Sequence, residues 1–215
     1  MIVAIDGPAG AGKGTITSLV AEELNLVTID TGATYRCVAL QCLNENVTLD
    51  EPEKIIEIAK KVKIDMDENK NVFLNGKNVT KEIRSTEVTS IVSPVSSIPE
   101  VRDEMVKLQR ELAKGKNVIM EGRDITTVVF PEADYKFYLD AEVEERARRR
   151  LKQNEEQGIE SNYDEILESI KKRDYNDMHK EKGALIRTED QIYIDSTNMS
   201  IEEVKETIIK HIKGE

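Results

Sequence analysis

The fold of this chain is decided by one stretch, Gly7-Pro8-Ala9-Gly10-Ala11-Gly12-Lys13-Gly14-Thr15. It fits the pattern GxxxxGK, and Gly-Thr follows the lysine where Ser or Thr most often comes at once. A short apolar run, residues 2–5, precedes it, and residues 13–24 carry apolar side chains at helical spacing. A strand, a glycine-rich turn and a helix in this order are typical of a loop that surrounds nucleotide phosphates with backbone N–H groups. The stretch therefore predicts an ATP-binding loop over residues 7–15.

The side chains of this loop have separate expected roles. Lys13 supplies a positive charge to the β and γ phosphates, and the Thr15 hydroxyl is expected to meet Mg²⁺. A tight glycine turn without catalytic meaning is the alternative, and the flanking strand and amphipathic helix argue against it. A GTPase is disfavoured, because the Asn69-Lys70 pair is followed by Asn71-Val72 and no NKxD element results.

Apolar runs along the chain predict the sheet. Besides residues 2–5, buried strands are expected at 27–29, 117–120, 135–139 and 191–194. Helical stretches between them imply right-handed crossovers, and therefore an α/β fold with a parallel five-stranded sheet covered by helices on both faces. Residues 61–79 differ, since short alternating runs flank an Asn75-Gly76 turn, which predicts an inserted antiparallel hairpin unit.

Composition limits the possible partners and location. The formal net charge of −11 argues against a general nucleic-acid binder, whose surface would be basic. Cys37 and Cys42 lack a metal-binding partner set and are expected to be reduced, buried packing residues. We find no leader and no apolar run of membrane-spanning length, so we expect a cytoplasmic protein with no membrane partner.

Two arginines follow predicted strands and face the phosphate loop. Arg36 ends the segment DTGATYR after the second strand, and Arg123 lies in EGRD after the third. Ligands bind at the carboxyl ends of strands in open parallel sheets. Because arginine grips phosphate with two N–H groups, these positions predict a second phosphate, on the acceptor of a phosphoryl transfer.

Six segments, in this order, resemble the bacterial cytidylate kinases over essentially the whole chain: GPAGAGKGT, DTGATYR, STEVTSIVSPVSSIPEVR, EGRDITTVVFP, EERARRR and KKRDYND. The resemblance implies one P-loop NTPase-like kinase domain over 1–215, with an inserted monophosphate-binding subdomain at roughly 50–98 and a lid at roughly 150–165. It implies transfer from ATP with Mg²⁺ to CMP, and also to dCMP. Nucleotides are then the expected partners, and we expect a monomer.

The same resemblance implies a role for each motif residue. Ser93, Arg102 and Asp124 would read the cytosine edge, Arg36 and Arg123 would hold the CMP phosphate, and Arg173 with Asp177 would hold the ribose. Thr31 and Lys180 belong to the same substrate site, at positions where the family usually has Ser and Arg. Ala184 and Glu121 occupy positions where the family usually has Pro and Asp. For Arg102, a solvated surface arginine is the alternative.

Two further arginines lie on the predicted helix that enters the lid. By analogy with the wider monophosphate kinases, Arg146 is assigned to the adenine and Arg150 to the moving phosphoryl group, so that Lys13, Arg123 and Arg150 form the catalytic set. An i, i+4 charge lattice with Glu142 and Glu145 explains Arg146 and Arg150 equally well.

Other functions on the same core stay open. A kinase for UMP or for a small metabolite shares the phosphate loop, although a metabolite kinase would lack the base-reading residues. A regulator that binds or hydrolyses ATP without phosphorylating an acceptor belongs to a different class. Such a regulator would not need arginines on the acceptor side.

Overall fold

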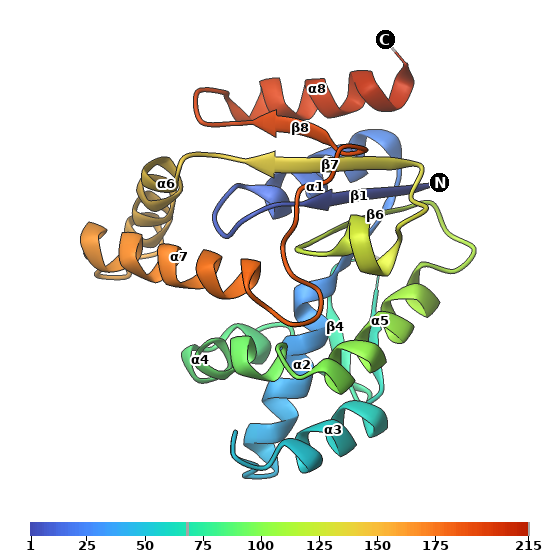
Figure 1. Cartoon of the computed structure of the whole chain (residues 1–215), viewed down its shortest axis with the longest axis vertical. Coiled ribbons are helices and arrows are strands. Elements are labelled where there is room, and N and C mark those ends of the chain that lie inside the picture. The colour runs from blue at the N-terminus through green and yellow to red at the C-terminus, as the bar shows by residue number, and fades with distance from the viewer. Residues whose placement is uncertain (68, 215) are drawn as a thin grey trace.

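The computed structural model describes residues 1–67 and 69–214 and has a five-stranded sheet at its centre (Figure 1). The strands are β1 (Ile2–Asp6), β2 (Val27–Asp30), β6 (Val118–Gly122), β7 (Tyr135–Asp140) and β8 (Ile192–Asp195). Their order is β2-β6-β1-β7-β8, and every neighbouring pair is parallel. The predicted parallel sheet is confirmed, with each strand within two residues of its expected bounds.

Helices cover both faces of this sheet. The helices are α1 (Lys13–Leu24), α2 (Thr31–Asn44), α3 (Pro52–Lys61), α4 (Thr86–Val95), α5 (Pro99–Ala113), α6 (Val143–Glu156), α7 (Tyr163–Met178) and α8 (Ile201–Lys213). Side chains alternate along β1, so Val3 and Ile5 pack with α1 and α8, whereas Ala4 packs on the other face with Val106 of α5. The phosphate loop, between β1 and α1, therefore lies over a core that is buried on both faces.

A second core is built from α2, α5 and the segment between them. It contains β3 (Ile64–Met66), β4 (Val72–Leu74) and β5 (Lys77–Asn78) in an antiparallel sheet, together with α3, the short turn η1 (Glu82–Arg84) and α4. Asn75 and Gly76 both have positive φ, as a two-residue hairpin turn requires, and Leu74 pairs with Lys77 across it. The expected hairpin unit is confirmed. Its role in binding the monophosphate stays a prediction.

Both cysteines are buried in this second core, as the sequence predicted. Cys37 and Cys42 lie on α2 with almost no exposed surface. Burial raises the pKa of both thiols, to about 12 for Cys37 and to about 11 for Cys42. Thiols of this kind stay protonated near neutral pH and act as packing groups.

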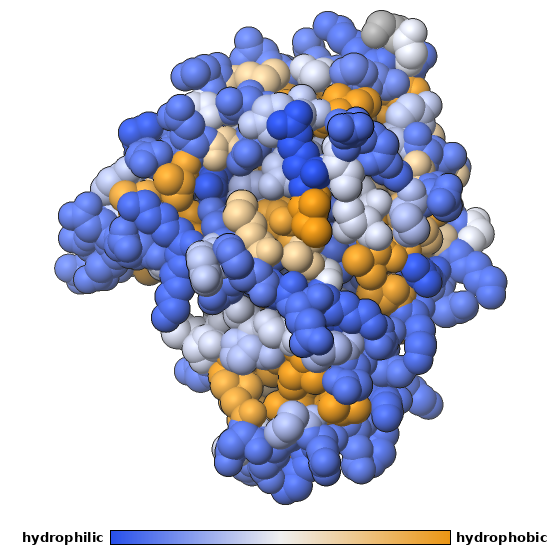
Figure 2. Space-filling model, viewed as in Figure 1, coloured by the Kyte–Doolittle hydropathy of each residue, from blue (hydrophilic) through white to orange (hydrophobic). Residues whose placement is uncertain are grey.

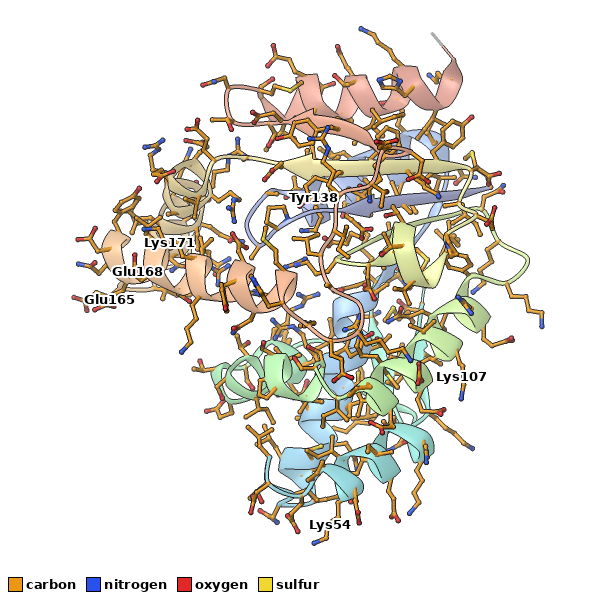
Figure 3. The ribbon with its side chains drawn as sticks, in the orientation of Figure 1. Lys54, Lys107, Tyr138, Glu165, Glu168 and Lys171 are labelled. Carbon is orange, nitrogen blue, oxygen red and sulfur yellow. The ribbon has the colours of Figure 1, made fainter. Side chains whose placement is uncertain are left out.

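The segment expected to be a lid is more helical than the sequence suggested. Helix α6 runs on to Glu156, and only residues 157–162 form the connection to α7. The two helices lie side by side at the carboxyl ends of the strands (Figure 1). Figure 3 shows Glu165, Glu168 and Lys171 on the outer side of α7, away from the sheet. Any lid movement would therefore carry the ends of two helices rather than a free loop.

The surface is mainly hydrophilic on the face that Figure 2 shows, with small, separate hydrophobic patches. Across residues 1–67 and 69–214, none of the helices combines the length and the apolarity that crossing a membrane needs.

Candidate active site

The phosphate loop is shaped by close backbone packing. At Gly7 (φ 151°) an added Cβ would overlap the carbonyl oxygen of Leu139 on β7, so the turn admits only glycine. Lys13 is 4% exposed, and its Nζ donates to the Pro8 carbonyl at 2.7 Å. Burial, and then the nearby Arg123, lower the pKa of Lys13 below its usual value. A buried ammonium in this position is stabilised by an anion, which the loop is shaped to receive.

A buried ion pair supports the loop from α6 and α7. Arg146 Nη1 lies 2.6 Å from Asp174 Oδ2 and donates to the Ala9 carbonyl at 2.9 Å. The other Asp174 oxygen accepts from Ala9 N at 3.3 Å. The Arg146 guanidinium thus contacts the protein under the loop, and its predicted contact with the adenine stays a prediction. Its Cβ also lies 3.3 Å from the point where a Gly10 Cβ would stand.

A cavity of about 240 Å³ opens beside the loop on the side of Thr15. It is lined by Ala11, Gly12, Thr15, Ile16, Glu145, Arg149, Ser196, Thr197, Met199, Ser200, Ile201 and Val204. Arg149 donates to the Ser196 carbonyl at 2.6 Å and so joins α6 to the loop after β8. Sequence reasoning missed Arg149, because three adjacent arginines on a helix do not reveal which one lines the cavity.

The Glu121 carboxylate lies next to Gly14 of the loop, and the charge of Asp30 acts on it. Glu121, at the end of β6, has its Oε1 only 2.8 Å from the point where a Gly14 Cβ would stand. Removal from water raises the pKa of Glu121, with Lys13 opposing this and Asp30 adding to it. Within the described chain the Glu121 carboxylate accepts no hydrogen bond from a protein donor. Thr31 donates its hydroxyl to the Glu121 backbone carbonyl at 2.6 Å, so Thr31 joins β6 to α2.

Arg102 and Asp124 form a buried ion pair at the entrance to the second core. The Arg102 residue is 3% exposed and the Asp124 residue 5%, which excludes the surface alternative for Arg102. Arg102 also donates to the Ser96 carbonyl at 3.0 Å, and its guanidinium lies over the Tyr35 ring, 5.2 Å from the centroid. Its Nε is buried without a partner in the part of the chain that the structure covers. An unpaired donor beside a carboxylate matches a ligand that both donates and accepts.

The turn that carries Asp124 is held by Asp6. Both Asp6 oxygens accept hydrogen bonds from the turn η2 (Ile125–Val129): Ile125 N at 2.9 Å, Thr126 N at 2.8 Å and Thr126 Oγ1 at 2.6 Å. Asp6 is fully buried, and this burial raises its pKa. Both Asp6 oxygens thus bind the turn, and through it Asp6 positions Asp124.

Charged residues of α7 meet Arg123 at the same sheet edge. Arg123 Nε donates to Asp177 at 2.7 Å, and Lys180 Nζ lies 3.1 Å from the other Asp177 oxygen. Burial alone would raise the pKa of Asp177, but Arg123 and Lys180 hold it below its usual value. Arg173 lies on the same side of α7, close enough for Arg123 and Arg36 to act on its charge. The structure thus brings together the residues assigned to the acceptor phosphate and ribose.

Arg36 meets this cluster from α2. Its Nη1 donates to the Ile83 carbonyl at 3.1 Å and to Thr89 Oγ1 at 2.9 Å. Arg150 donates to Gln153 on its own helix, at 2.9 Å, and its charge acts on Arg36. Ser93 is half-buried, and its carbonyl accepts from the Ser96 and Ser97 hydroxyls. It is the carbonyl of Ser96, three residues on, that contacts Arg102.

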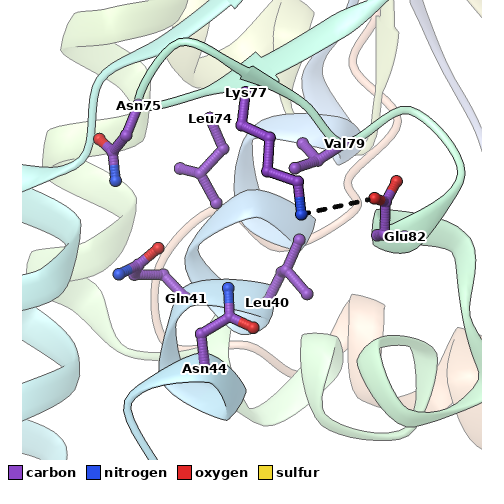
Figure 4. A pocket seen from close by; sticks show the side chains of 8 residues that line it. All are labelled: Leu40, Gln41, Asn44, Leu74, Asn75, Lys77, Val79 and Glu82. Atoms are coloured by element: carbon purple, nitrogen blue, oxygen red, sulfur yellow. Dashed lines mark ion pairs between the residues drawn. The ribbon is translucent and has the colours of Figure 1, made fainter.

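A second cavity lies away from these charges. It has a volume of about 260 Å³ and is lined by Leu40, Gln41, Asn44, Leu74, Asn75, Lys77, Val79 and Glu82, between α2 and the small sheet (Figure 4). These α2 residues stand at the opposite end of the helix from Thr31. In the described residues, no group of three or more His, Cys, Asp or Glu side chains forms a metal cluster.

Comparisons with known proteins agree with this arrangement. The sequence profile of one family, described as Cytidylate kinase, matches residues 3–214. A protein named Cytidylate kinase from Caldanaerobacter subterraneus subsp. tengcongensis is 48% identical over 99% of this chain and 96% of its own length. Its namesake in Bacillus subtilis is 42% identical over 98% and 96%. A solved structure of an uncharacterized protein from Eubacterium ventriosum covers the whole chain with a TM-score of 0.55 and 14% identity, which supports the fold alone.

Proposed function

The chain belongs to the cytidylate kinase family, and we propose that its buried Arg102–Asp124 pair selects CMP as the phosphoryl acceptor. The enzyme transfers the γ-phosphoryl group of ATP to the phosphate of CMP, giving CDP and ADP. A carboxylate and a guanidinium, buried together beside a cluster of arginines, carry this conclusion. They match a base with both donor and acceptor atoms, joined to a phosphate.

Base selection follows from the hydrogen-bonding atoms of cytosine. Its exocyclic amino group donates, which suits the Asp124 carboxylate, and its acceptor atoms suit the free Nε–H of Arg102. Uracil carries an oxygen where cytosine has the amino group, so UMP would turn an acceptor toward the carboxylate. Ser93 completes the proposed set from α4. We also propose that dCMP is accepted, with Arg173 and Asp177 facing the sugar.

Catalysis in this proposal consists of positioning and charge neutralisation. Lys13 and the N–H groups of residues 7–15 hold the ATP phosphates, and the cavity lined by Thr15 and Arg149 receives the adenosine. Arg36 and Arg123 hold the CMP phosphate in line with the γ-phosphoryl group. The attacking phosphate oxygen is already nucleophilic, so no general base is required. Arg150 would reach the moving phosphoryl group when the ends of α6 and α7 close.

Magnesium fits the donor set next to Lys13. Mg²⁺ keeps most of its waters and is bound through one or two carboxylates together with substrate phosphates. Glu121 and Asp30 provide such carboxylates, and Glu121 has no protein donor within residues 1–67 and 69–214. When bound, the ion neutralises charge on the β and γ phosphates. Thr15 also lines the cavity beside the loop, and its predicted contact with Mg²⁺ stays a prediction. We propose that Glu121 and Asp30 hold the hydrated ion.

The remaining proposals concern the state of the protein in the cell. We propose that it works as a monomer, because the acceptor and donor sites are built from one chain. We propose a cytoplasmic location, where ATP and CMP are available.

One assay tests the activity. ADP release is measured with MgATP and CMP, dCMP, UMP or AMP in turn, and also with no acceptor. We expect CMP and dCMP to give the highest kcat/KM, and ATP alone to give almost no turnover. Equal rates with CMP and UMP would remove the base-reading role, and turnover without any acceptor would favour an ATP-hydrolysing regulator.

A further inference from the structure

Arg84 is a cation of the active site that no sequence motif had singled out. It belongs to the turn η1 of the inserted unit, and its side chain is 58% exposed. Its Nη2 donates at 2.9 Å to Asp30 Oδ2, at the carboxyl end of β2. The pair therefore spans from the inserted unit to the central sheet. Arg84 reaches it because Ile83 is fully buried in the second core and fixes the turn.

Two arginines are held side by side by this turn. The Ile83 carbonyl accepts from Arg36, while the next residue, Arg84, points to Asp30. Burial lowers the pKa of Arg36, and the charge of Arg84 lowers it further. Two guanidinium groups with one carboxylate near them leave a surplus positive charge, and like charges repel. Such an arrangement is stabilised by a further anion that bridges them.

The surroundings of Arg84 identify the class of anion. Its charge acts on Glu121, beside the phosphate loop, as well as on Arg36. It thus lies between the position of the donor phosphates and that of the acceptor phosphate. We propose that Arg84 binds the acceptor's phosphate group, and that Asp30 holds it in place until that phosphate arrives. The inference rests on the proposed CMP kinase function and adds a phosphate contact to it.

The geometry of Asp30 explains how the exchange can be reversible. Its other oxygen, Oδ1, accepts from Ala33 N at 3.0 Å and caps α2, so the carboxylate keeps its place when Arg84 leaves. The Arg84–Asp30 pair is exposed to solvent and is therefore weak, whereas a phosphate dianion offers Arg84 a stronger, bidentate contact. Asp30 is also near enough to Glu121 for its charge to act there, so a released Asp30 would be available to the proposed hydrated magnesium.

Binding measured without ATP and magnesium tests the contact. Dissociation constants for CMP, and for cytidine, which lacks the phosphate, are compared in wild type and Arg84→Ala. We expect CMP to bind about 10- to 100-fold more weakly in the variant, the range for a lost hydrogen bond to a charged group, and cytidine to bind as before. Arg84→Lys should recover part of the loss. An unchanged affinity for CMP, or an equal loss for cytidine, overturns the proposal.

Two more variants separate phosphate binding from a structural role. Lys77→Ala, which removes the exposed Lys77–Glu82 pair in the same unit, should leave CMP binding unchanged. Asp30→Asn keeps a capping side chain but removes the charge that competes for Arg84, so CMP should bind a few-fold more tightly. Weaker CMP binding by Asp30→Asn would mean that the pair is only a structural link, against the proposal. A wild type that phosphorylates UMP as well as CMP would defeat the cytosine selection and leave this phosphate contact testable.

Discussion

The two sides of the active site are built in different ways. On the donor side, one continuous stretch of nine residues forms the phosphate cradle, and its shape depends on backbone conformation. On the acceptor side, the charged side chains come from α2, η1, α5, the turn after β6 and α7. Here each of four arginines already has a protein partner: Arg102 with Asp124, Arg123 with Asp177, Arg84 with Asp30, and Arg36 with the Ile83 carbonyl.

This difference has an energetic consequence. The donor side presents its N–H groups and Lys13 to the ligand without first breaking an ion pair. The acceptor side must exchange contacts between protein groups for contacts to CMP, so its net binding energy is a difference between two sets of contacts. We therefore expect donor-side changes to act mainly on the rate of transfer, and acceptor-side changes to act on affinity and on the choice of base.

Lys13→Ala should have the largest effect. The side chain donates to the Pro8 carbonyl of its own loop, and in the proposed mechanism it binds the transferred phosphoryl group. Its loss should lower kcat by about 10²- to 10³-fold or more, the scale of a removed transition-state donor. Thermal unfolding and CMP binding should stay close to wild type, because a buried ammonium adds little to stability. A kcat within tenfold of wild type would contradict the role of Lys13.

Asp124→Asn comes next, and it tests base selection. Leaving Arg102 without its charged partner should cost roughly 1 to 3 kcal/mol in kcat/KM for CMP. UMP should lose less, because it makes no donor contact with Asp124, so the CMP-to-UMP ratio of kcat/KM should fall. Asp103→Asn is the matched control, since Asp103 follows Arg102 on α5 and forms an exposed ion pair with Lys182. An unchanged ratio in Asp124→Asn would refute the base-reading role and leave Asp124 as a partner for Arg102 alone.

The same contrast explains how far the sequence could predict the structure. The phosphate loop, the five strands and the hairpin turn at Asn75-Gly76 depend on local patterns, and all were predicted correctly. The arginines of EERARRR could not be told apart, because helical spacing leaves several faces open: Arg146 supports the loop, and Arg149 lines the cavity. Arg84 and Ser96 carry no local signal, and their positions depend on the packing of Ile83 and on the approach of Arg102.

Gly183→Ala should have an intermediate effect on the acceptor side only. Gly183 (φ 69°) is buried in the segment after α7, and a Cβ there would overlap Arg102 Nη2, Arg102 Nε and Asp124 Oδ2. Displacing the pair should raise the KM for CMP by about tenfold, within the cost of overpacking, and leave the KM for ATP unchanged. Gly115→Ala is the matched control, because it has almost the same φ (72°) with open space around the Cβ.

Both glycine variants should lose about 1 to 2 kcal/mol of stability from the left-handed backbone. Gly183→Ala should lose about 1 to 3 kcal/mol more, because its Cβ overpacks the buried pair. Only Gly183→Ala should change the use of CMP. If the two variants have equal KM values for CMP, the segment after α7 does not shape the base site. A raised KM for ATP in Gly183→Ala would instead indicate a general disturbance of the fold.

Lys180→Arg should give the smallest effect, which is visible only in alkaline solution. Lys180 Nζ lies 3.1 Å from Asp177 and 3.3 Å from Ser96 Oγ, and the side chain is 8% exposed. Burial lowers the pKa of Lys180; Asp177 opposes this, and Arg102 and Arg123 add to it. A lysine is charged only below its pKa, so Lys180 loses its proton, as pH rises, before an ordinary lysine with a pKa near 10.4 would.

The loss of this charge should weaken CMP binding on the alkaline side of the pH profile. Arginine stays protonated throughout, so Lys180→Arg should extend the plateau of kcat/KM for CMP to higher pH, with less than about a threefold change near pH 7. The pKa of Lys13 is also lowered. Rates are therefore measured at saturating ATP, whose phosphates face Lys13 in both proteins. Lys182→Arg serves as control, because Lys182 pairs with Asp103 and is 42% exposed. If kcat/KM for CMP falls at the same alkaline pH in wild type and in Lys180→Arg, the charge of Lys180 does not contribute to CMP binding. The effect of ion pairs on CMP binding would then depend on Arg123 and Asp177 without Lys180.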